Sequence, residues 1–334
     1  MDDQLVIQHT EDISSQDIQE RLENGPGALI VRGAYQDNAL LDSVSSTFFA
    51  RIENEGNQAA DHFASGSNQR LWNAVNKLAE DAPQLFADYY GNEWLHRVSK
   101  AWLGPLYQIT AQVNVVVPGG APQRGHRDYH LGFYPESLVA EMPDLIRQAS
   151  AQLTLQGAII HCDVPVEMGP TKLLLGSQND RNGYLTYRRP EEQERFEREF
   201  SQIPFKKGDL VFFNPSIFHA AGGNQTRDPR LVNLLQISSA LAKPMEHLDF
   251  PALVRKVYPH LLNQTDRNLV SRAIRAMVDA YPFPSNLDLD PPCDDWLGEL
   301  ETNWLFHAWK TKRTPSEVIS DYTNRRNRRF YRSA

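Results

Sequence analysis

Hydrophobic positions follow two different spacings along the chain, and the change between them divides the sequence into three regions. Between about residues 15 and 103, apolar residues mostly recur three or four positions apart, as in "SQDIQERLEN" and "RLWNAVNKLAEDAPQLFADYY". This spacing predicts helices that are buried on one face. The exception is "ALIVRG" at 28–33, a compact apolar run after the turn "GPG", which predicts a strand.

The spacing changes near residue 106. Short apolar or β-branched segments are separated by Gly, Pro and Asn, without the alternation of strand and helix that a parallel sheet requires. The segments are "LYQITAQVNVVVPGG", "SAQLTLQGAIIHCDV", "TKLLLGS", "DLVFFNPSIFHAAG" and "RLVNLLQISSAL". They predict an antiparallel jelly roll or barrel.

Helical spacing returns after residue 241, in "FPALVRKVYPHLLN", "TDRNLVSRAIRAMVDAY" and, after a Pro- and Asp-rich loop at 282–295, "WLGELETNWLFHAWKTK". Trp296, Trp304 and Trp309 recur at spacings of eight and five, which favours packing over a cofactor site.

The whole chain is therefore expected to form one elaborated domain with a mainly β core. Three parts are predicted: an N-terminal helical and β support (1–104), a catalytic core (105–240) and a helical C-terminal extension (241–334).

Composition narrows the range of functions. The chain has 334 residues, of which 41% are hydrophobic, and a formal net charge of −8. An acidic protein is a poor general binder of nucleic acid or anionic membranes, so we expect a small-molecule substrate. Two cysteines, no long apolar run and no secretory signal at the N-terminus predict a cytoplasmic protein without a disulfide framework; the oligomeric state stays open.

The candidate chemistry begins at "RGHRDYH", residues 124–130. His126 and Asp128 are two positions apart, and on an extended strand such side chains project from the same face. Both could bind one metal ion, although a single His-x-Asp also recurs by chance.

A second histidine strengthens this interpretation. His219 ends an apolar strand, a Gly/Asn turn follows, and Arg230 begins the next strand, so a hairpin is expected to bring the two together. Two histidines and one carboxylate form the facial triad of non-haem Fe(II) oxygenases. The planar guanidinium of Arg230 suits a carboxylate, and 2-oxoglutarate has the shape to reach from the iron to that arginine.

Four stretches in this order resemble a known family: "NVVVPGG" leading to "HRD", then "IIHCDVPVEMGPTKLLLGSQ", "GDLVFFNPSIFHAAGGN" and "RDPRLVNLLQ". The family is that of the phytanoyl-CoA dioxygenase-like Fe(II)/2-oxoglutarate oxygenases, which include ectoine hydroxylase. The resemblance covers about 105–240. It implies a double-stranded β-helix, that is, a cupin-like jelly roll.

The resemblance also implies roles for individual residues. His126, Asp128 and His219 would be the iron ligands, and Arg230 would hold the distal carboxylate of 2-oxoglutarate. Asn114 matches an asparagine that often touches 2-oxoglutarate. Thr171, the residue after the Gly-Pro pair, is a further co-substrate contact, although relatives often carry an aromatic or aliphatic residue there.

By the same resemblance, the protein would use O₂ and 2-oxoglutarate to hydroxylate an unactivated C–H bond, releasing succinate and CO₂. Asp128 argues against halogenation, because halogenating relatives carry Gly or Ala in its place. Two alternatives remain open: a jelly-roll metalloenzyme that does not use 2-oxoglutarate, and a non-catalytic binding module.

Several other residues and segments could also contribute to the site. His161 is expected to be a core or supporting group, and His130 to face solvent or substrate. Arg124 shares the face of His126 only if the strand is extended. The stretch 129–150 leaves the metal-binding segment at once and then has helical spacing, so it forms either a flap over the iron or a fixed helix. The arginines of the tail "TNRRNRRFYRSA" predict a helix end that is either solvated or salt-bridged within the chain, in preference to an anion-binding site.

Overall fold

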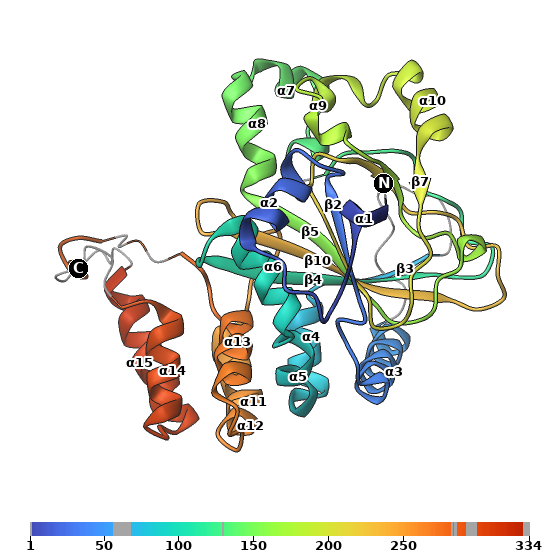
Figure 1. Cartoon of the computed structure of the whole chain (residues 1–334). Coiled ribbons are helices and arrows are strands. Elements are labelled where there is room, and N and C mark those ends of the chain that lie inside the picture. The colour runs from blue at the N-terminus through green and yellow to red at the C-terminus, as the bar shows by residue number, and fades with distance from the viewer. Residues whose placement is uncertain are drawn as a thin grey trace.

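The larger of two β-sheets forms the centre of the molecule (Figure 1). The computed structural model describes residues 2–55, 68–128, 130–281, 283, 286–291 and 299–329. Seven strands lie in the order β1-β2-β8-β5-β10-β4-β3, and all neighbours are antiparallel except β1 and β2. They are β1 (Val6–Gln8), β2 (Ala28–Arg32), β3 (Gln69–Leu71), β4 (Tyr107–Val116), β5 (Thr154–Ile160), β8 (Leu210–Phe213) and β10 (Arg230–Ser239).

A smaller sheet packs on one face of the larger one and has the order β7-β6-β9. Its strands are β6 (Lys172–Leu174), β7 (Ser201–Gln202) and β9 (Phe218–Ala220). The hairpin predicted for His219 and Arg230 is wrong: β9 pairs with β6, whereas β10 pairs with β4 and β5 in the other sheet. The turn-forming residues after His219 therefore cross between sheets instead of joining paired strands.

Helices cover both sides of this core, as Figure 1 shows. One side carries α3 (Asn38–Glu55), α4 (Ala74–Asp81), α5 (Phe86–Tyr90), α11 (Phe250–Lys256), α12 (Tyr258–Leu261) and α13 (Arg267–Met277). The other carries α7 (Glu136–Glu141), α8 (Asp144–Gln152), α9 (Gly183–Thr186) and α10 (Pro190–Glu199). The remaining helices are α1 (Asp2–Leu5), α2 (Ser15–Glu23), α6 (Glu93–Leu103), α14 (Glu301–Lys310) and α15 (Pro315–Arg329).

Strand β4 shows why the sheet is buried on both faces. Its odd-numbered side chains, Ile109, Ala111, Val113 and Val115, join the apolar cluster beneath the helices. Its even-numbered side chains face the opposite way, and Gln112 and Asn114 line a pocket. The alternation of apolar and polar residues along a fully buried strand therefore marks the floor of a cavity.

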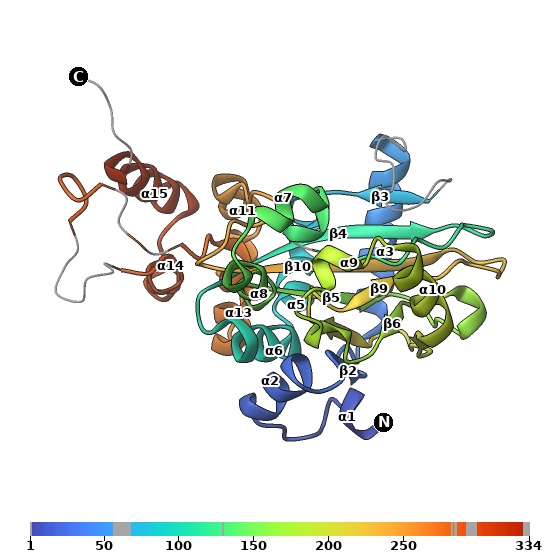
Figure 2. The same ribbon diagram turned by 90° about the horizontal axis from the view of Figure 1, so that it is seen from above.

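The C-terminal helices share the main apolar core with the sheet. Phe250, Leu305 and Val318 belong to the same buried cluster as the outer face of β4. Figure 2 shows α14 and α15 at one end of the molecule. The prediction that Trp304 and Trp309 serve packing is confirmed, since both are buried in this cluster.

The arginines near the C-terminus form ion pairs within the chain. Arg325 pairs with Glu299, and Arg328 and Arg329 pair with Asp290, so the predicted internal salt bridges are confirmed. Trp296 and Cys293 lie outside the described residues. None of the helices in the described part of the chain has the length and apolarity needed to cross a bilayer.

The predicted mixture of a sheet-rich core with helices at both ends is confirmed.

Candidate metal centre and its pocket

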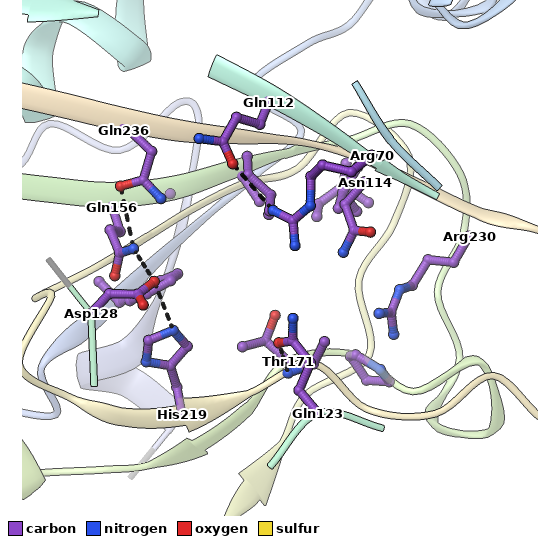
Figure 3. A pocket seen from close by; sticks show the side chains of 18 of the residues that line it. Arg70, Gln112, Asn114, Gln123, Asp128, Gln156, Thr171, His219, Arg230 and Gln236 are labelled. Atoms are coloured by element: carbon purple, nitrogen blue, oxygen red, sulfur yellow. Dashed lines mark hydrogen bonds and ion pairs between the residues drawn. The ribbon is translucent and has the colours of Figure 1, made fainter. Parts of the chain in front are cut away.

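The pocket lies on the inner face of the large sheet, and the smaller sheet and the 117–128 segment contribute to its walls. Figure 3 shows Asp128 and His219 on one side and Arg230 on the other. The side chains that were predicted to act together therefore line one cavity.

The three candidate ligands converge, but not in the way the sequence predicted. His126 and Asp128 lie in an irregular segment instead of a strand. His126 forms an isolated antiparallel bridge with His219, with backbone hydrogen bonds of 2.8 and 2.9 Å in the two directions. The amide of Asp128 donates to the carbonyl of Pro215 at 3.1 Å. These bonds join the two ligand-bearing segments directly.

The ring nitrogens of both histidines are oriented for metal binding. Nδ1 of His126 lies 2.8 Å from the carbonyl of Arg124, and Nδ1 of His219 lies 2.9 Å from the carbonyl of Ile217. A carbonyl only accepts, so each Nδ1 carries the proton and each Nε2 directs its lone pair toward the pocket. The two Nε2 atoms lie 3.8 and 3.7 Å from oxygens of Asp128.

Burial and charge suit a cation at this position. One ligand atom from each residue of the triad lies within 4.8 Å of the others, and all three residues are buried. Burial and the neighbouring His126 lower the pKa of His219 to about 4, so its imidazole is neutral near pH 7. A buried carboxylate between two imidazoles whose Nε2 atoms face it can hold a metal ion.

Arg127 fixes this irregular segment from behind. Its side chain is buried and donates to the carbonyls of Ser177, at 2.9 Å, and Ser216. A Cβ on Gly183 would lie 2.2 Å from the Arg127 guanidinium carbon, so only glycine leaves room for it. Because Ser216 lies in the turn that leads into β9 and His219, Arg127 links the segments that carry the candidate ligands.

Arg230 forms the other end of the pocket. Its guanidinium is buried and donates to the carbonyls of Met168, at 3.0 Å, and Gly222, at 3.2 Å. Burial lowers the pKa of Arg230 to about 10, so it remains charged at neutral pH. Among the described residues, no carboxylate pairs with it, which leaves the charge available for an anion that enters the cavity.

Comparison with known sequences gives the family. A model of the family described as Phytanoyl-CoA dioxygenase (PhyH) matches residues 9–232, which is more than half of the chain. The chain belongs to the PhyH family. The match includes the triad and Arg230 and ends within β10, so the helices of the C-terminal extension lie beyond the PhyH region.

Individual relatives are more distant. The dioxygenase olcK of Penicillium canescens is 27% identical over 180 residues, which are 53% of this chain and 49% of that protein. The chain thus spans about half the length of the curated relative it matches.

Solved structures with similar folds include two enzymes of nogalamycin biosynthesis. The non-heme alpha-ketoglutarate-dependent carbocyclase SnoK has a TM-score of 0.49 and 15% identity, with 69% of this chain and 85% of that chain covered. The epimerase SnoN, in complex with Fe³⁺, alpha-ketoglutarate and nogalamycin RO, has a TM-score of 0.44 and 17% identity over 68% and 84%. AviO1 from Streptomyces viridochromogenes Tue57 has a TM-score of 0.49 and 17% identity over 70% and 99%.

Asn114 and Thr171, the two further co-substrate candidates of the PhyH resemblance, both line the pocket. Asn114 lies opposite Val232 in the β4–β10 ladder, two positions along the strands from the pair that Arg230 forms with Val116. Its Oδ1 is buried without a hydrogen-bond partner in the described structure, so a ligand with a donor could satisfy it.

The sequence interpretation missed a group of polar side chains in the pocket lining: Arg70, Gln112, Gln123, Gln156 and Gln236. In Figure 3, Arg70 points toward the middle of the pocket and donates to Gln112 at 3.2 Å. A signal was available for three of the glutamines. Gln112, Gln156 and Gln236 each lie between apolar residues in a predicted strand and so mark one face of that strand as polar, as a strand that lines a polar cavity requires.

The other candidates from the sequence, His161, His130 and Arg124, lie outside the pocket lining. His161 is buried between Ser45 and Tyr89, at 2.8 and 2.7 Å, and burial lowers its pKa to about 3, so it is a core group as predicted. His130 lies 3.4 Å from the carbonyl of Lys243. Arg124 is exposed and donates to the carbonyl of Arg188, so it does not share the face of His126.

Proposed function

We propose that this protein is an Fe(II)- and 2-oxoglutarate-dependent dioxygenase that hydroxylates an unactivated C–H bond of a small-molecule metabolite. One observation carries the proposal: two imidazoles and a carboxylate share a pocket with a buried guanidinium that lacks a carboxylate partner in the described residues. Membership of the PhyH family supports it.

The donor set fits Fe(II). His126, Asp128 and His219 supply two nitrogen atoms and one oxygen, the combination that non-haem Fe(II) oxygenases use, and they would leave positions for other ligands. Iron in this site would supply the activation of O₂, with conversion of 2-oxoglutarate to succinate and CO₂. Asp128 would occupy the position that a halide takes in halogenating relatives, which favours hydroxylation.

The opposite end of the pocket suits the distal carboxylate of 2-oxoglutarate. Arg230 would bind it in two-point fashion, and the buried charge would find its missing counter-ion there. Thr171 and Asn114 line the same cavity and would add polar contacts. The two sheets, with these residues between them, would then form the double-stranded β-helix of the family.

The segment 129–150 would act as a flap that closes over the bound substrate and excludes water. In its described part, Leu131 and Val139 pack with Tyr184 in a small cluster separate from the main core. Phe133 lines the pocket, while Leu145 remains 75% exposed. A segment with its own small core could move without disturbing the sheet.

The test has two stages, both performed with the purified full-length protein. Anaerobic titration with Fe(II) and then 2-oxoglutarate measures assembly of the site, and succinate release is then followed in a screen of candidate metabolites. Mass spectrometry of the product distinguishes hydroxylation, which adds one oxygen atom, from desaturation or ring formation, which removes two hydrogen atoms.

The expected result is saturable binding of both components and succinate release that depends on one class of metabolite. Iron binding without any effect of 2-oxoglutarate would favour a metalloenzyme of another kind. Failure to bind iron at all would favour a non-catalytic binding module.

A further inference from the structure

The two oxygen atoms of the Asp128 carboxylate have different surroundings. Oδ2 accepts a hydrogen bond of 2.6 Å from Nε2 of Gln156. Oδ1 is buried and has no hydrogen-bond partner in the described structure. The Asp128 side chain is only 11% exposed, so water does not compensate freely for this difference.

Gln156 is held by regular structure on both sides. It lies in β5, where it pairs with Gln236 of β10 on one side and with Phe213 of β8 on the other. Its Nε2 also lies 3.3 Å from Oε1 of Gln236. Figure 3 shows the resulting row from Gln236 through Gln156 to Asp128. The donor that meets Asp128 is therefore placed by the central strands of the sheet.

We propose that Gln156 is a positioning residue that makes Asp128 a ligand through one oxygen atom only. The proposal rests on the metal site proposed above. The Gln156 amide would keep Oδ2 occupied and leave Oδ1 directed at the ion. With three protein ligand atoms, the ion would keep positions open for 2-oxoglutarate and O₂. A carboxylate bound through both oxygens would take one of these.

The physical reason lies in the strength and placement of this bond. A hydrogen bond to an ionised carboxylate is short and stronger than a neutral one, and an outer partner of this kind orients the ligand it touches. Without the Gln156 amide, Oδ2 would be buried and unsatisfied, and rotation about the Asp128 side chain toward the cation would satisfy it. Loss of Gln156 should therefore change the number of open positions as well as the affinity for metal.

The experiment uses Co(II) as an anaerobic spectroscopic probe for the site in the full-length protein. Gln156→Leu removes the amide with little change in size, and Gln156→Asn keeps an amide that is too short to reach Oδ2. Gln236→Leu is the matched control, because it removes the neighbour of Gln156 but leaves the bond to Asp128. Co(II) affinity, the visible absorption of the Co(II) complex and the apparent affinity for 2-oxoglutarate are measured for each.

Both Gln156 variants should bind Co(II) about 10–100-fold more weakly, the usual effect of losing an outer partner of a metal ligand. Their absorption with 2-oxoglutarate should differ from that of the wild type, because the coordination number differs. Gln236→Leu should stay within about threefold of the wild type in both respects, since its loss leaves the Asp128 contact intact.

Unchanged affinity and spectrum in a folded Gln156 variant would overturn this proposal alone. If Gln156→Leu does not fold, Gln156→Asn decides the question. Failure of the metal site itself has a separate signature: His219→Ala would then bind Co(II) as tightly as the wild type.

Discussion

The large sheet and the 117–128 segment hold side chains of the same pocket by different means. Gln156 and Arg230 lie on strands, where backbone hydrogen bonds to neighbouring strands fix their positions. His126 and Asp128 lie on an irregular segment, whose place depends on an isolated bridge and on the buried side chains of Arg127 and Tyr184.

This difference teaches where the site is vulnerable. A side chain on a strand can be replaced with local consequences, because the ladder of backbone bonds remains. A side chain on the irregular segment depends on a few buried polar contacts, so loss of one can displace its neighbours. Variants in the two regions should therefore fail in different ways.

The largest expected effect is loss of a ligand. Alanine at His126, Asp128 or His219 should abolish activity and weaken Fe(II) binding by more than about 100-fold, since loss of an outer partner alone costs about 10–100-fold. Anaerobic Fe(II) titration measures this. His161→Ala is the matched control and should keep iron binding. Wild-type turnover in any of the three ligand variants would contradict the assignment of the triad.

Arg127→Met tests the irregular segment without touching a ligand. It removes charge-assisted bonds to two buried carbonyls and should lower the free energy of unfolding by about 2–4 kcal/mol. The thermal unfolding midpoint and the Fe(II) affinity should fall together, because Arg127 joins the two segments that carry the candidate ligands. If the variant loses stability but binds Fe(II) normally, Arg127 stabilises the fold without positioning the metal site.

Arg230→Ala tests the strand-held end. It should reduce the apparent affinity for 2-oxoglutarate about 10–100-fold, from a lost contact of roughly 1.5–3 kcal/mol, and leave Fe(II) affinity near the wild-type value. Arg230→Lys should recover only part, because an ammonium lacks the planar fork of the guanidinium. Unchanged dependence on 2-oxoglutarate in both variants would exclude this role.

Glu246 shows both ways of holding the structure, because a buried side chain takes the place of a strand. Its carboxyl group accepts backbone hydrogen bonds at the edge of the sheet, where a neighbouring strand would otherwise accept them. It accepts from the amides of Asn73, at 2.7 Å, and Ala111, at 3.2 Å. Burial raises the pKa of Glu246 to about 7, above that of the unfolded chain, so the folded state keeps its proton longer. The free energy of unfolding should therefore fall as pH rises from about 4.5 to 7, and this group adds no further change above that window.

Glu246→Gln isolates this contribution. Between pH 5 and 8, the wild type should lose about 2–3 kcal/mol of unfolding free energy relative to the variant, measured by denaturant titration. A constant difference between the two proteins across this range would show that Glu246 has an ordinary pKa.

The smallest expected effect concerns the proposed flap. A metabolite that supports succinate release, together with 2-oxoglutarate, should slow hydrogen exchange across 129–150 severalfold more than 2-oxoglutarate alone. Strand β5 serves as the internal reference, since its amides are already protected by the ladder. Equal protection of the segment in both states would favour a fixed helix, and specificity would then have to come from elsewhere.

The sequence contained enough information to find the candidate ligands but not the way the fold holds them. His126, Asp128, His219 and Arg230 were identifiable because their chemistry and order are distinctive. The pairing of β10 with β4 and β5 was not, since a Gly/Asn turn looks the same whether it joins neighbouring strands or crosses between sheets. The role of Arg127 in joining the two segments could not be predicted, because an arginine in a polar motif is expected to be exposed, whereas this one is buried.

The continuous apolar core has a consequence for engineering. The PhyH match ends at residue 232, near the start of strand β10, which is paired on both sides, and the helices beyond it pack in the same core as the sheet. The boundary of shared ancestry is thus not a place to cut. Residues 105–240 therefore cannot be transferred alone to another protein. A chimera that contains them must also carry the C-terminal helices or supply an equivalent apolar cover for the outer face of β4.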